Sequence, residues 1–170
     1  MKILVPTETI GQRIFLVRGH KVMIDRDLAE LYGVENKYLN RQVKRNIIRF
    51  PEEFMFQLSA DEKNELVTIC HRFESMKHSK ALPYAFTEHG VAMLATVLRS
   101  ERAVAISIII IKTFVKLRQI ITTNKELAQK LAELEHRVGN HDVKIQAIFE
   151  AIKRLTMPAD VKKKEKIGFI

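Results

Sequence analysis

The stretch that decides the fold is 25–46, which reads DRDLAELYGVENKYLNRQVKRN. Its first half predicts a short helix over 26–32, with Asp25 as its N-cap and Gly33 as its stop. A second helix is expected over 36–49, because the chain must leave helical geometry before Pro51. Two short helices joined by a turn that contains glycine are typical of a helix-turn-helix.

The second of these helices has two contrasting faces. Leu39, Val43 and Ile47 repeat at i, i+4 and i+8 and predict a buried stripe. The rest of the helix is rich in hydrogen-bond donors and carries no acidic residue from 36 to 49. The candidate DNA-binding residues are Asn36, Lys37, Asn40, Arg41, Lys44, Arg45 and Arg49.

These donors suit contact with double-stranded DNA. Arginine and lysine can donate to guanine and asparagine can pair with adenine in the major groove. Arg45 and Arg49 lie at the flank, where contact with phosphates would position the helix without reading sequence. The alternative is a solvated amphipathic helix that happens to be basic. The lack of any acidic residue in this stretch favours the DNA contact.

The surrounding sequence predicts a small α+β domain that is mostly helical. Residues 13–17 and 22–24 predict a β-hairpin with its turn near Gly19. Alternation over 54–58 predicts a half-buried strand, and Ser59 with Glu62 forms a capping box for a helix to about residue 70. A loop is expected over 71–82. Thr87 and Ser100 are expected to cap two further helices, the second helical despite its isoleucine-rich run at 106–111.

A heptad pattern begins at residue 117 and predicts a long C-terminal coiled-coil helix. Asn124 at an a position favours a parallel dimer, although isoleucine at both a and d positions leaves trimers or tetramers open. A helical hairpin that turns at Gly139 and Asn140 is the alternative to a continuous helix. The candidate dimerisation residues are Asn124, Leu127, Leu131, Leu134, Val138, Ile145, Ile148, Ile152 and Leu155.

Composition limits the class of protein. The chain has 170 residues, 46% of them hydrophobic, and a formal net charge of +9 from 29 basic and 20 acidic residues. This is a globular composition, and its positive charge indicates a polyanionic partner. A single cysteine excludes a disulfide framework. A transmembrane helix requires about 20 apolar residues, and no apolar run in the sequence is that long. We expect a DNA-binding domain over 10–122, a coiled-coil dimerisation helix over 123–157 and a basic flexible tail over 158–170.

No catalytic or metal site is expected from the motifs. His71 follows Cys70, and His78 lies seven residues further on, but they lack the paired spacing of a zinc site. Neither a phosphate-binding glycine loop nor a nucleophile elbow is present in the sequence. RNA binding has little support, because no pattern of exposed aromatic residues suits stacking on single strands. The sequence therefore predicts a protein that is not an enzyme and uses no cofactor or metal.

Four stretches resemble a known family: IDRDLAELYGV at 24–34, LNRQVKRN at 39–46, RFPEEFMFQL at 49–58 and FTEHGVAML at 86–94. They make residues 14–118 similar to the KilA-N-type DNA-binding domains of bacteriophages and prophages. The closest branch is the "open reading frame six, N-terminal" domain, which is related to the N-terminal domains of phage antirepressors. Gln42 departs from a generic helix-turn-helix, which usually has an apolar residue nine positions after the turn glycine.

The resemblance implies a small α+β domain with a helix-turn-helix that binds DNA in a sequence-related manner in phage or prophage regulation. It also implies a bacterial cytoplasmic or nucleoid location and no catalysis. Together with the heptads, it predicts a homodimeric transcriptional regulator whose two basic helices enter successive major grooves. The alternative is an antirepressor-like interaction module, in which the coiled coil captures a repressor or another regulatory protein.

Overall fold

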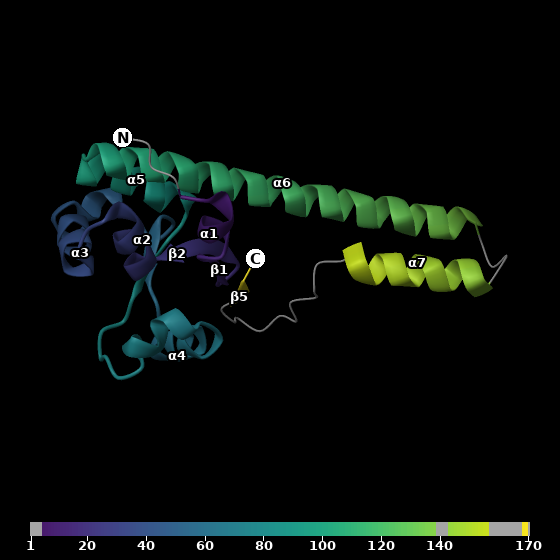
Figure 1. The fold of residues 1–170 in the computed structure, drawn as a ribbon, viewed down its shortest axis with the longest axis horizontal. Coiled ribbons are helices and arrows are strands. Elements are labelled where there is room, and N and C mark those ends of the chain that lie inside the picture. Colours follow the sequence, from purple (N-terminus) through teal and green to yellow (C-terminus); the bar gives the residue numbers. More distant parts are fainter. Residues whose placement is uncertain (1–4, 139–142, 157–167, 170) are drawn as a thin grey trace. The chain divides into compact units, whose positions relative to one another are not determined.

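The computed structural model describes residues 5–138, 143–156 and 168–169. The chain divides into two compact units, Met1–Phe114 with Glu165–Ile170 and Val115–Lys164. The first unit holds a small antiparallel sheet and the helix-turn-helix (Figure 1). The fold is α+β and mostly helical, as the sequence predicts.

The sheet is built around the predicted hairpin. Strands β1 (Ile14–Val17) and β2 (His20–Ile24) pair antiparallel through a two-residue turn. Both turn residues, Arg18 and Gly19, have positive φ values of 52° and 77°, as the favoured type I′ hairpin turn requires. Strand β4 (Tyr84–Phe86) pairs with β2, and β3 (Met55–Gln57) pairs with β4.

The edge of the sheet beyond β1 is occupied by the C-terminal end of the chain. Strand β5 (Gly168–Phe169) pairs antiparallel with β1, which makes the strand order β3-β4-β2-β1-β5. The expectation of a flexible tail over 158–170 is therefore wrong for these two residues, since they supply partners for the open backbone groups of β1. Residues 157–167 and 170 of that tail lie outside the described residues.

Helices make up most of the described chain. They are α1 (Thr7–Gly11), α2 (Asp25–Tyr32), α3 (Asn36–Arg45), η1 (Ile47–Arg49), α4 (Ala60–Ile69), η2 (His71–Met76), α5 (Glu88–Leu98), α6 (Glu101–Val138) and α7 (Val143–Thr156), where η marks a 3-10 helix. The capping box is confirmed, since the Ser59 side chain accepts the Glu62 N–H and the Glu62 side chain accepts the Ser59 N–H. Thr87 caps α5, and Ser100 Oγ accepts the Ala103 N–H at 3.0 Å at the start of α6.

Four local expectations are wrong. Helix α3 ends at Arg45 instead of 49, because the chain leaves α-helical geometry at Asn46 and continues as the 3-10 turn η1. That change of register leaves Ile47 55% exposed, outside the buried stripe to which we assigned it. Asp25 is the first residue of α2 instead of its N-cap, although its Oδ1 accepts the N–H of Arg26 at 2.8 Å. The expected loop over 71–82 begins with η2.

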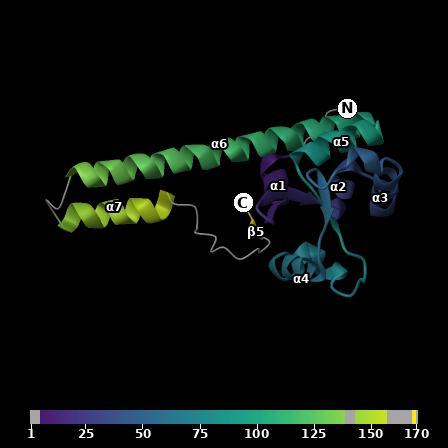
Figure 2. The same ribbon diagram turned by 180° about the vertical axis from the view of Figure 1, so that it is seen from behind.

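The core of the first unit joins the sheet to the helices that surround it. Phe15 of β1 contacts Phe73 of η2, with ring centroids 5.9 Å apart, and both are buried. The first turns of α6 are also part of this core, since Ala103, Ile106 and Ile110 are fully buried. In Figures 1 and 2, α2, α3 and α5 form one group and α4 lies apart from it.

The second unit contains the rest of α6 and α7. The coiled-coil positions described there include the exposed side chains of Leu127, Leu134 and Ile148, at 44%, 50% and 59%. Asn124, Ile152 and Leu155 are also exposed, and Leu131 is half-buried. The side chains of Val138 and Ile145 lie outside the described residues, as do residues 139–142, where the hairpin alternative places its turn. The coiled coil and its form therefore remain predictions.

Candidate nucleic-acid interface

The turn between α2 and α3 sets the direction in which α3 leaves. Gly33 has a φ of +70°, a backbone conformation in which an L residue with a side chain is strained. Its N–H donates to the carbonyl oxygen of Glu30 at 3.1 Å, and the N–H of Val34 donates to that of Ala29 at 3.0 Å. These bonds close the C-terminus of α2 in the manner of a glycine cap. A Cβ at residue 33 would also lie 3.0 Å from Nε of Arg102.

The inner face of α3 is anchored by apolar packing. Leu39 and Val43 are buried, at 0% and 3% exposure, as the sequence predicts. Helix α3 contacts both α2 and α5. On α2, the side chains of Leu28, Ala29 and Tyr32 are buried. The opposite face of α3 is thereby turned away from the core.

That outer face is basic and unpaired. Lys37, Arg41, Lys44 and Arg45 are all exposed, and within the described part of the chain none of their side chains makes a hydrogen bond or ion pair. Tyr38, which the sequence reasoning missed, is 40% exposed. It lies three residues before Arg41 and seven before Arg45, so a helical projection of α3 would have found it.

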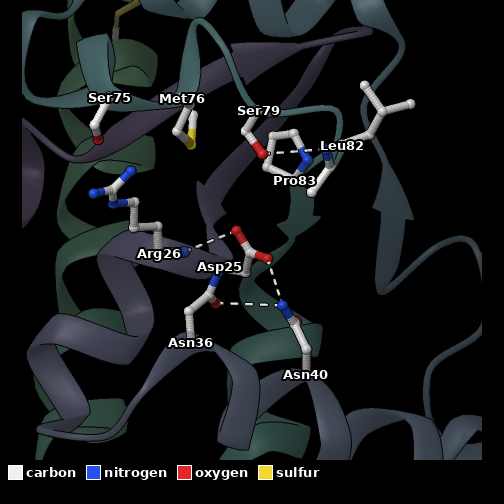
Figure 3. Close-up of a pocket in the computed structure, with 10 residues that line it drawn as sticks. Asp25, Arg26, Asn36, Asn40, Ser75, Met76, Ser79, Leu82 and Pro83 are labelled. Atoms are coloured by element: carbon white, nitrogen blue, oxygen red, sulfur yellow. Dashed lines mark hydrogen bonds between the residues drawn. The ribbon is translucent and has the colours of Figure 1, made fainter.

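Asn36 and Asn40 lie differently from these cations. Asn40 is half-buried, and its Nδ2 donates to Oδ2 of Asp25 at 2.9 Å and to Oδ1 of Asn36 at 3.4 Å (Figure 3). Burial raises the pKa of Asp25, while hydrogen bonds from Asn40 and the Arg26 backbone oppose that shift. The donor that we expected Asn40 to offer to adenine is therefore engaged in tying α3 to the start of α2.

Arg49 is also separated from the cations of α3. It lies in η1, and its Nη1 donates to Oγ1 of Thr96 on α5 at 3.5 Å. The structure thus brings Lys37, Arg41, Lys44 and Arg45 onto one helix face. It places Arg49 beside α5 and turns Asn36 and Asn40 toward Asp25.

A cavity of about 460 Å³ adjoins α3 on the side of Asn36 and Asn40. Asp25 and Arg26 line the same cavity. Its other wall comes from a segment far away in sequence, which Figure 3 shows across from Asn36 and Asn40. The lining residues of that segment are Ser75, Met76, Ser79, Ala81, Leu82 and Pro83.

The sequence Thr87-Glu-His-Gly90 holds α5, which in turn supports α3. The carbonyl oxygen of Phe54 accepts the backbone N–H of Thr87 at 3.0 Å and its hydroxyl at 3.2 Å. His89 stacks on the Phe54 ring at 5.4 Å between centroids. A Cβ at Gly90 would lie 2.2 Å from the same carbonyl oxygen. The motif therefore joins the start of α5 to the chain before β3.

Other kinds of site find no support in the described residues. Residues 5–138, 143–156 and 168–169 contain no group of three or more histidine, cysteine, aspartate or glutamate side chains that could hold a metal ion. None of the helices in these ranges has an apolar stretch long enough to cross a bilayer.

Comparison with known proteins identifies the domain that contains α2, α3 and most of α5. Residues 12–97, just over half of the chain, match the ORF6N domain. The match includes the hairpin, the helix-turn-helix and most of α5. Searches of curated proteins and of solved structures give no significant match. The match over residues 12–97 shows that this chain belongs to the ORF6N domain family.

Proposed function

We propose that this chain binds double-stranded DNA in a sequence-related manner, as a homodimeric transcriptional regulator of phage or prophage type. The observation that carries the proposal is the outer face of α3. Lys37, Arg41, Lys44 and Arg45 project from it, and within the described residues no acidic side chain pairs with them. Membership of the ORF6N domain family supports this interpretation.

The dimensions and chemistry of α3 suit the major groove. A helix about 10 Å across with its side chains fits a groove about 12 Å wide. On this outer face, Lys37, Arg41 and Lys44 are the donors proposed to reach guanine O6 and N7. Arg45 is assigned to phosphates, and Asn40 acts as a positioning residue through Asp25. The proposed activity includes no catalytic step and no cofactor.

Dimerisation is proposed to use the exposed heptad positions of the second unit. Leu127 and Leu134 on α6, and Ile148 on α7, expose large apolar side chains that a partner helix would cover. Two copies would present two α3 helices to successive major grooves, about 34 Å apart. The setting we propose is the bacterial cytoplasm, at the nucleoid.

The test is fluorescence anisotropy with a mixed-sequence duplex of about 30 base pairs, long enough for two half-sites one helical turn apart. The wild type is titrated at several salt concentrations beside the variant K37A/R41A/K44A. The control K112A/K116A/K125A removes the same charge from exposed positions of α6. Circular dichroism checks that all three proteins are folded.

We expect salt-dependent binding by the wild type and the control. The α3 variant should bind more weakly, because it lacks the three donors proposed to reach guanine and the positive charge that they bring to the duplex. Absence of wild-type binding at low salt would refute the proposal. Equal binding by the α3 variant and its control would refute the role of α3.

A second candidate function is an antirepressor-like interaction module. The observation that favours it is the same set of exposed leucines and isoleucines in the second unit, which a helix of another protein could also cover. Sedimentation analysis of the full chain distinguishes the two. A monomer that binds no DNA would favour the interaction module, and a dimer that binds DNA would favour the regulator.

A further inference from the structure

A second basic surface lies across the cavity from α3. Immediately after η2, the chain reads Lys77-His78-Ser79-Lys80, and all four residues are exposed. Ser79 lines the cavity of about 460 Å³ whose opposite wall includes Asn36 and Asn40 of α3 (Figure 3). We call this basic segment the 77–80 loop, and through Ser79 it borders the cavity next to α3.

The 77–80 loop is held in place by contacts on both sides. On one side η2 anchors it through Phe73 and Met76, which are 1% and 9% exposed. On the other, Nε2 of Gln57 donates to the carbonyl oxygen of Leu82 at 3.1 Å. A loop held at both ends presents its side chains at low conformational cost.

The middle of the loop is bound as well. Lys63 is only 5% exposed, and its Nζ donates to the carbonyl oxygen of Ser79. The N–H of Ala81 donates to Oγ of the same serine at 3.2 Å. The contact with Lys63 also links the loop backbone to α4.

The charge around the loop favours an anion. Within the described residues, the ammonium groups of Lys77 and Lys80 make no hydrogen bond or ion pair. Glu74 is the acidic residue nearest to the loop in sequence, and its Oε2 lies 3.3 Å from Nδ1 of His71. Asp25 lines the cavity but is 2% exposed, and its two oxygens accept hydrogen bonds from the Arg26 N–H and Asn40. The exposed charge of the loop is therefore positive.

We infer that the 77–80 loop is a second DNA-contacting element, which binds the phosphate backbone beside the groove that α3 enters. This inference rests on the proposed function and deepens it. The ammonium groups of Lys77 and Lys80 serve as point charges for phosphate oxygens. Such contacts add affinity and fix the register of α3 without reading sequence.

The test uses the full-length chain and the same duplex and salt series as above. The variant K77A/K80A is compared with K112A/K116A, which removes the same charge from exposed positions of α6. A second variant, K77R/K80R, keeps the charge of the loop. Because the side chains of Lys77 and Lys80 are exposed and make no hydrogen bond or ion pair within the described residues, unfolding midpoints should be unchanged.

If each lysine neutralises one phosphate, the slope of log K against log salt for K77A/K80A should be shallower by about 2 per subunit. Affinity at the lowest salt should fall at least about tenfold. The decrease should be the same for unrelated duplex sequences, and K77R/K80R should restore binding. If K77A/K80A behaves like K112A/K116A while K37A/R41A/K44A fails to bind, the loop inference is overturned and the proposed function stands. If the wild type does not bind DNA, both fail.

Discussion

Replacing Gly90 by alanine tests how closely α5 is joined to the chain before β3. The added Cβ would lie 2.2 Å from the carbonyl oxygen of Phe54, and real Cβ atoms essentially never approach closer than 3.0 Å. The contact must therefore open by about 0.8 Å, the difference between 3.0 and 2.2 Å. Phe54 cannot yield freely, because its carbonyl oxygen accepts the N–H of Thr87 and shares the hydroxyl of Thr87 with the carbonyl oxygen of Glu53.

The cost follows from these contacts. Overpacking of a tight site costs about 1–3 kcal/mol, and weakening two hydrogen bonds adds about 1 kcal/mol each. Alanine stabilises a helix by up to about 1 kcal/mol relative to glycine, which offsets part of this cost. We therefore expect Gly90→Ala to lower the free energy of unfolding by about 2–4 kcal/mol.

The assay is guanidinium chloride unfolding followed by circular dichroism, with the slope m compared between proteins. The matched control is Gly11→Ala at the end of α1, where an added Cβ meets nothing within 4 Å. That control should stay within about 0.5 kcal/mol of the wild type. A Gly90→Ala protein that matches the control would refute the argument that the Phe54 carbonyl forbids a side chain at this position.

Two further predictions concern buried polar groups. Nε and Nη2 of Arg72 donate to Oδ1 and Oδ2 of Asp27 at 3.0 and 2.9 Å, and Asp27 is 1% exposed. Arg72→Ala removes both of these hydrogen bonds. It should cost about 3 kcal/mol in the same unfolding assay, the lower end for a broken buried ion pair, because Nη1 of Arg13 still lies 3.6 Å from Oδ1 of Asp27. A cost below about 1 kcal/mol would contradict this prediction. Burial raises the pKa of Tyr32 to about 12 from 10.0, although its hydrogen bond to Ser107 opposes the shift. The Tyr32 phenol therefore loses its proton at a higher pH in the folded chain than in the unfolded chain. As pH rises from about 10 to about 12, the free energy of unfolding should fall by up to about 3 kcal/mol. Tyr32→Phe should lack that part of the pH dependence, and an identical pH profile for both proteins would show that Tyr32 titrates normally.

The sequence by itself determined the features that depend on neighbouring residues. The capping box of Ser59 and Glu62, the N-cap at Thr87 and the stop at Gly33 each involve contacts within about five residues, so local chemistry predicts them. The helix-turn-helix and the α+β class follow from these signals and from periodicity. The basic character of α3 was also readable, since Leu39 and Val43 define which side is buried.

Tertiary structure decided which partner each polar or apolar side chain meets. Asn40 belongs to the basic stretch by sequence, yet it donates to Asp25, while Tyr38 is exposed on α3. The approach of the 75–83 segment to α3 has no sequence signal, because no local spacing relates residues so far apart. Periodicity likewise predicts an apolar stripe along α6 without naming its partner. The upstream continuation of that stripe, including Ile106 and Ile110, is buried in the first unit, whereas large side chains further along remain exposed. A local pattern specifies what must be covered, and only contacts between distant parts of the chain decide what covers it.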